Sequence, residues 1–133
     1  MTPSEEFSKE SYEINFEYRP QYMYVKVKSD RASVEMSLAV WAKIAERRTK
    51  TELKKILIET DMPKSLTAGE FFWVRSQSPA VDFPGYKIAI ADPYPEKRSV
   101  NEFGDTVSFN RGVFTQTFTN FEDAEQWLLE SED

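Results

Sequence analysis

The chain has 133 residues, of which 40% are hydrophobic, and a formal net charge of −6. These values predict a single domain with a sizeable core, and the acidic balance argues against nucleic-acid binding, which depends on clustered Lys and Arg. The chain contains neither cysteine nor histidine, which excludes disulfides, Cys/His zinc sites and imidazole-based catalytic triads. No loop has the spacing of a metal or phosphate site, so we expect no metal and no cofactor.

The first 48 residues predict a tail, a hairpin and a helix. Residues 1–10 are polar and are expected to form a flexible tail without the features of a signal peptide, which favours a cytoplasmic location. Residues 11–19 and 22–27 alternate between apolar and polar side chains around a break at Arg19-Pro20-Gln21, a pattern typical of an antiparallel hairpin. Residues 33–48 have helical spacing. The buried stripe of this helix is predicted at Val34, Leu38, Trp41 and Ala45, widened by Val40 and Ile44, with Ser33 as N-cap.

Strands and helices are predicted to alternate through the rest of the chain. The aliphatic runs at 53–60 and 86–91 indicate strands covered on both faces, as in a parallel sheet. The other predicted elements are helices at 67–77 and 95–110, a strand at 113–119 and a terminal helix capped by Asn120. This order predicts an α/β fold over residues 11–133, with a mixed sheet that is parallel in the centre, an N-terminal antiparallel hairpin and about four helices. No apolar run is long enough to span a membrane.

The C-terminal third carries motifs of a known family. These are Lys87-Ile88-Ala89-Ile90, Asn110-Arg111-Gly112, Phe118-Thr119-Asn120, and Ala124 followed by Trp127-Leu128. Together with the order of elements, they resemble the SpoIIAA-like branch of the STAS (anti-sigma-factor antagonist) family, which is related in fold to the lipid-binding SEC14 group. The resemblance covers about residues 12–130 by element order, and none of its motifs is catalytic.

The resemblance also implies a place for a phosphorylated serine, at the start of the helix after the third predicted strand. Sporulation antagonists of this fold carry an Asp-Ser motif there. This chain lacks the motif and reads Asp61-Met62-Pro63-Lys64-Ser65-Leu66-Thr67 instead. Ser65 or Thr67 occupies the corresponding place, so these two residues are the candidate phosphosites.

The predicted second helix contains four consecutive apolar residues, 71–74, which point all the way round a helix. Only one side of the helix can pack on the sheet. The loop at 78–85 could cover the rest, or Phe72 and Trp73 could line a homodimer interface or an apolar pocket.

The loops after the parallel strands form the second candidate surface, because ligands of open α/β sheets bind beyond the carboxyl ends of the strands. This rule selects two groups of residues. They are Thr60, Asp61, Ser65 and Thr67 in one loop, and Asp92, Pro93 and Tyr94 in the other. The alternative is that Thr67 only caps its helix and that Asp61 and Asp92 only form turns.

These patterns favour a non-enzymatic regulatory or protein-interaction module of the SpoIIAA-like type, which could bind another protein or a second copy of itself. A carrier of a small apolar, lipid-like ligand is the alternative, by analogy with the SEC14 group. An unrecognised hydrolase-type enzyme is the third possibility, and it would need converging polar groups in a cleft. The basic cluster Arg47, Arg48, Lys50, Lys54 and Lys55 could contact an acidic partner or could be a solvated helix end.

Overall fold

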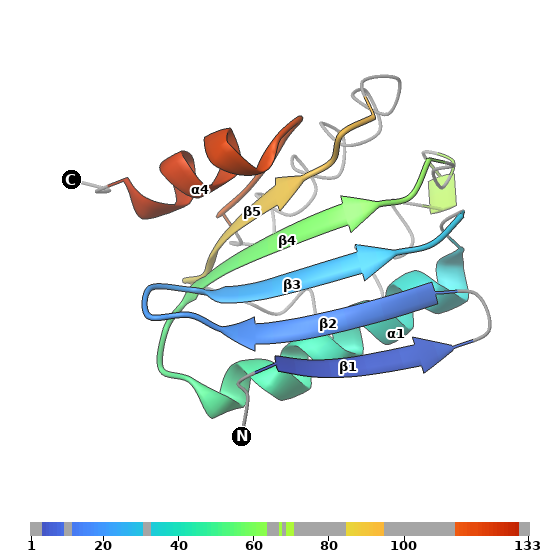
Figure 1. Cartoon of the computed structure of the whole chain (residues 1–133), viewed down its shortest axis with the longest axis horizontal. Coiled ribbons are helices and arrows are strands. Elements are labelled where there is room, and N and C mark those ends of the chain that lie inside the picture. Colours follow the sequence, from blue (N-terminus) through green and yellow to red (C-terminus); the bar gives the residue numbers. More distant parts are fainter. Residues whose placement is uncertain are drawn as a thin grey trace.

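The computed structural model describes residues 4–9, 12–30, 33–63, 67, 69–70, 85–94 and 114–130. Their main feature is a six-stranded sheet whose strands follow one another in sequence order. The strands are β1 (Ser4–Lys9), β2 (Tyr12–Tyr18), β3 (Met23–Lys28), β4 (Lys55–Asp61), β5 (Lys87–Ala91) and β6 (Phe114–Phe118). Pairing is antiparallel from β1 to β3 and parallel from β3 to β6 (Figure 1). The predicted mixed sheet and its N-terminal hairpin are therefore confirmed.

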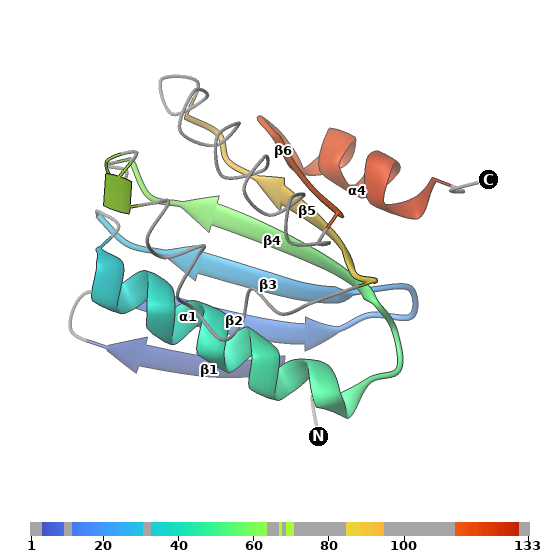
Figure 2. The ribbon, with the colours of Figure 1, turned by 180° about the vertical axis from the view of Figure 1, so that it is seen from behind.

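Helix α1 (Val34–Arg47) covers one face of the sheet. Ser33 caps it as predicted, because the Ser33 hydroxyl accepts a hydrogen bond from the backbone N–H of Met36. Behind the helix, alternate residues of β2 and β3 and the Ile side chains of β4 and β5 form the larger core. Figure 2 shows α1 in front of β1 and β2. A short 3₁₀ helix, η1 (Arg48–Lys50), ends this segment.

The buried face of α1 differs from the predicted stripe. Val40 and Ile44, which widened the predicted stripe, are buried against the sheet together with Met36, whereas Val34, Leu38, Trp41 and Ala45 are only half-buried. At about 100° per residue, the centre of the predicted stripe lies roughly a third of a turn from the observed one. The prediction was right for Val40 and Ile44 but placed the centre of the stripe wrongly, because α1 carries apolar residues over most of its circumference and spacing alone does not locate the side that meets the sheet.

Helix α4 (Phe121–Leu129) lies on the opposite face of the sheet from α1 (Figures 1 and 2). Asn120 caps it as predicted, by accepting a hydrogen bond of 2.8 Å from the backbone N–H of Asp123. Ala124 and Leu128 are fully buried against Leu57 and Ala89. The small residues of β5 allow α4 to approach the sheet closely, which builds a second, smaller core.

The N-terminal segment forms a strand that the sequence did not predict. The N-terminal ten residues were expected to be a tail, but Ser4–Lys9 pairs with β2 as an edge strand, with Phe7 opposite Ile14. Its mostly polar sequence hides the strand, since backbone pairing with the open edge of β2 needs no particular side chains.

The predicted helix at 95–110 and most of that at 67–77 lie outside the described residues. No helix in the described part of the chain is long and apolar enough to cross a membrane.

Candidate functional site

A cavity of about 310 Å³ opens at the carboxyl ends of β4 and β5, beside the start of α4. It lies where the sequence placed its second candidate surface, since Asp61 and Tyr94 both line it. The lining residues are Lys26, Glu59, Thr60, Asp61, Ala91, Pro93, Tyr94, Thr119, Asn120 and Phe121. Most of these carry polar or charged side chains, so the cavity suits polar groups of a ligand or partner.

The structure brings together three of the predicted site residues, Asp61, Asp92 and Tyr94. The Tyr94 hydroxyl donates a hydrogen bond of 2.6 Å to Oδ1 of Asp61, and the Tyr94 backbone N–H donates one of 3.1 Å to Oδ1 of Asp92. Asp92 is buried, and its backbone N–H donates to the carbonyl of Phe118. The segment after β5 is therefore fastened to the ends of β4 and β6. Asp92 supports this loop, while Asp61 and Tyr94 face the cavity.

Thr60 and Pro93, which the same rule selected, also line the cavity, but the remaining predicted site residues do not join this cluster. Ser65, Phe72 and Trp73 lie outside the described residues. Thr67 is exposed and forms the predicted capping box with Glu70. In it, the Glu70 N–H donates to the Thr67 hydroxyl over 3.2 Å, and the Thr67 N–H donates to the Glu70 carboxylate over 3.0 Å. The Thr67 hydroxyl thus has a structural role at a helix start, and its phosphorylation stays a prediction.

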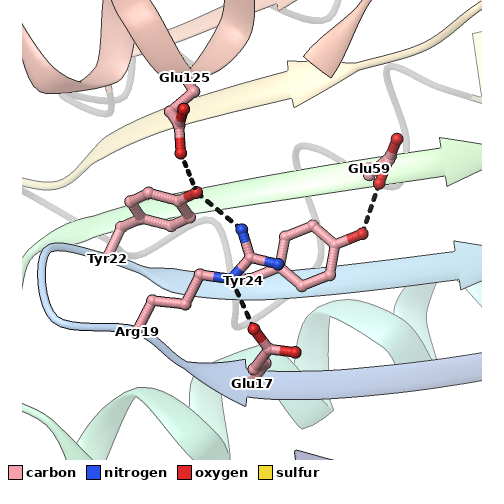
Figure 3. Close-up of polar contacts among 6 residues, drawn as sticks. All are labelled: Glu17, Arg19, Tyr22, Tyr24, Glu59 and Glu125. Atoms are coloured by element: carbon pink, nitrogen blue, oxygen red, sulfur yellow. Dashed lines mark hydrogen bonds and ion pairs between the residues drawn. The ribbon is translucent and has the colours of Figure 1, made fainter. Parts of the chain in front are cut away.

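A network of side chains on the α4 side of the sheet was missed by sequence reasoning (Figure 3). Arg19 follows β2, and its Nε donates to Glu17 over 2.6 Å while its Nη1 donates to the hydroxyl of Tyr22 over 2.9 Å. The Tyr22 hydroxyl in turn donates to Oε2 of Glu125 on α4 over 2.5 Å. This chain of contacts links the β2–β3 hairpin to α4.

Aromatic rings extend this network to the cavity. The Arg19 guanidinium lies 4.1 Å from the centre of the Tyr24 ring and 5.7 Å from that of Phe121. The Tyr24 and Phe121 rings meet edge to face, with centroids 6.1 Å apart. The Tyr24 hydroxyl donates to Glu59, whose carboxylate also pairs with Lys26 over 3.7 Å.

Because Lys26, Glu59 and Phe121 line the cavity, the network and the cavity form one continuous surface. We call this surface the carboxyl-end site after its cavity, from which it extends to Arg19 and Tyr22 at the amino end of β3. It comprises Glu17, Arg19, Tyr22, Tyr24, Lys26, Glu59, Asp61, Tyr94, Phe121 and Glu125.

Three hydrogen-bond donors of the site, Arg19, Tyr22 and Tyr24, have pKa values raised above their ordinary values. Burial raises the pKa of the Tyr24 phenol, and the hydrogen bond to Glu59 raises it further. Burial and the bond to Glu125 likewise raise the pKa of Tyr22, against an opposing effect of Arg19. Burial acts to lower the pKa of Arg19, but its hydrogen bonds to Glu17 and Tyr22 outweigh this and raise it. These three side chains therefore act as hydrogen-bond donors and do not exchange protons near pH 7.

One sequence signal could have revealed this network. In β3, the buried residues Met23, Val25 and Val27 alternate with Tyr24 and Lys26. A large aromatic ring on the polar side of a hairpin strand needs cover from another element or from a partner. The partners of Tyr22 and Tyr24 on α4 and β4 are 103 and 35 residues away in sequence, so spacing could not identify them.

The described residues include no group of three or more Asp, Glu, His or Cys side chains that could hold a metal ion. Each cavity carboxylate already accepts a hydrogen bond, Asp61 from Tyr94 and Glu59 from Tyr24. The arrangement is therefore suited to presenting donors, acceptors and ring faces to a binding partner. No protein-family model matches the chain, and no curated protein matches it either.

Proposed function

We propose that the chain is a non-enzymatic, cytoplasmic protein-interaction module of the SpoIIAA-like type, and that the carboxyl-end site binds its partner. The observation that carries the proposal is the ordered stack of Arg19 on Tyr24 beside Phe121, held from both ends by hydrogen bonds. Arginine and aromatic residues are enriched among the residues that dominate binding energy at protein interfaces.

The fixed positions of the side chains in the site also support a role in binding. Carboxylates on β2, β4 and α4 fix Arg19, Tyr24 and Tyr22 respectively. Side chains that are already fixed lose little conformational entropy when a partner docks, which leaves more of the contact energy for affinity. The cavity next to the stack adds a depression into which a partner side chain can insert.

The site supports chemistry less well than binding. A general base needs a pKa near the working pH, but the pKa values of Tyr22 and Tyr24 move upward, away from neutrality. A carrier of an apolar ligand needs an apolar lining. The cavity has the volume for a small ligand, but Lys26, Glu59 and Asp61 line it and would lose hydration to an apolar guest.

The test uses the tagged chain to capture proteins from extracts of the cells that naturally produce it. The proteins that the wild type retains are compared with those that two variants retain. Phe121→Ala removes the ring beside Arg19. The matched control, Phe114→Ala, removes a 43% exposed ring at the other end of the α4 side. We expect the wild type and Phe114→Ala to retain the same partner and Phe121→Ala to lose it. Calorimetry with the purified partner should show the same loss of binding for Phe121→Ala.

Equal retention by both variants would contradict the proposal, as would the absence of any specific partner. Native mass spectrometry of the same samples shows whether the chain binds a second copy of itself. A homodimer that Phe121→Ala dissociates and Phe114→Ala preserves would make the partner a second copy of the chain.

A further inference from the structure

A second cavity, of about 430 Å³, lies at the opposite end of the strands from the first, at the amino ends of β4 and β5. Three lysines line it, Lys54, Lys55 and Lys87, against a single acidic residue, Glu52. This local excess of positive charge stands out in a chain with a net charge of −6. The cavity lies at the opposite end of the strands from Asp61 and Tyr94, and its lining residues Pro20 and Gln21 adjoin Arg19 and Tyr22 of the carboxyl-end site. The inference drawn from it rests on its lysines and not on the proposed function.

Two of the three lysines, Lys55 and Lys87, are held close together by the fold. Lys55 and Lys87 are direct neighbours across the parallel pair of β4 and β5, so their side chains start from the same face of the sheet. Like charges opposite one another on neighbouring strands repel. Lys87 cannot move away, because it is 5% exposed and its Nζ donates to the carbonyl oxygens of Trp127 and Glu130, over 2.7 and 3.4 Å.

The other two lysines are not neutralised. In the described part of the chain, neither Lys54 nor Lys55 has a carboxylate within ion-pair distance. Lys54 instead places its Nζ 5.0 Å from the centre of the Tyr86 ring, and the guanidinium of Arg48 lies 5.4 Å from the same centre. Lys54 and Lys55 thus give the cavity two cations that have no carboxylate partner among the described residues.

One wall of the cavity is open to a ligand. Gly85 has a φ of 83°, a conformation that favours glycine, and it lines the cavity at the turn before β5. Gly85 therefore places no side chain into the cavity. A small ligand could approach the lysines past the backbone.

We propose that this amino-end cavity binds a small, multiply charged anion of the phosphate class, such as a pyrophosphate or a phosphate monoester. A ligand with two or more negative charges would offset the repulsion between Lys55 and Lys87 and would pair with Lys54 at the same time. The volume is within the range of small-molecule sites. A long polyanion such as DNA or RNA fits less well, because the rest of the acidic surface would repel it.

The experiment titrates the full chain with inorganic pyrophosphate by isothermal calorimetry at low, constant ionic strength. We expect Lys55→Gln to weaken binding about tenfold, and the double variant Lys54→Gln/Lys55→Gln to abolish it, since each lysine contributes a close charge pair. Lys28→Gln is the matched control, because exposed Lys28 lies at the carboxyl end of β3, next to Asp61 in register. It makes the same change in net charge and should bind as the wild type does.

A second arm uses vesicles containing phosphatidic acid, which present the same phosphate monoester as a lipid headgroup. Vesicle binding that Lys55→Gln weakens would assign the ligand to a membrane surface. Pyrophosphate binding without vesicle binding would assign it to soluble phosphates. The proposal is overturned if the wild type binds in neither arm, or if Lys28→Gln and Lys55→Gln weaken binding equally.

Discussion

Replacing Leu128 by alanine should loosen α4 from the sheet by a predictable amount. Leu128 is 0% exposed, and its cluster contains Ala89, Ala91 and Ala124, which are too small to fill the space that the substitution leaves. Leu→Ala changes in such sites cost about 2–5 kcal/mol, and the inability of these alanines to collapse into the cavity favours about 3 kcal/mol or more. The chain should remain folded, because a domain of 133 residues has a stability of roughly 7–20 kcal/mol.

Urea denaturation followed by circular dichroism measures this loss. With a slope of about 1–3 kcal/mol per molar urea, a loss of about 3 kcal/mol should lower the midpoint by roughly 1–3 M. The adjacent Leu129→Ala is the matched control, since Leu129 is only half-buried and should lose about 1 kcal/mol or less. Equal losses for the two variants would refute the packing of α4 described above.

Three further predictions concern polar contacts. Asn120→Ala removes the cap of α4 and should lower the free energy of unfolding by about 1 kcal/mol in urea denaturation, whereas no change would contradict the capping role. Because the folded-state pKa of Tyr24 is raised above its unfolded value of 10.0, stability should be complete below pH 10 and fall as pH rises further. Tyr24→Phe should reduce this alkaline loss in thermal melts at a series of pH values, and an unchanged profile would count against the buried phenol. Lys87→Met removes a charge-assisted hydrogen bond to the end of α4 and should increase amide hydrogen exchange at Leu128 and Leu129; unchanged exchange would show that Lys87 does not hold the helix end.

Much of the sheet could be predicted because burial shows in the local pattern. Residues 12–18 alternate between buried and more exposed positions, and residues 87–91 are buried throughout. These patterns distinguish a half-buried hairpin strand from a parallel strand covered on both faces. The side-chain caps at Ser33 and Asn120 were also predictable, because a cap bonds to a backbone N–H only three residues away.

What could not be predicted depends on contacts between distant segments. The orientation of α1 depends on which side of a mostly apolar helix meets the sheet, and β1 depends on the open edge of β2. Asp61, Asp92 and Tyr94 were predicted as neighbours because the carboxyl ends of parallel strands share one edge. Arg19 was treated only as part of a turn, since nothing near it in sequence indicates that Tyr24 and Phe121 will meet its guanidinium.

The carboxyl-end site is tested most directly by nuclear magnetic resonance of the isotope-labelled chain, titrated with the purified partner that the wild type retains. The account predicts that the largest shift changes occur at the amides of Arg19, Tyr24 and Phe121, and that they disappear in Phe121→Ala. Changes confined to α1 or to the amino-end cavity, with these three amides unmoved, would contradict it.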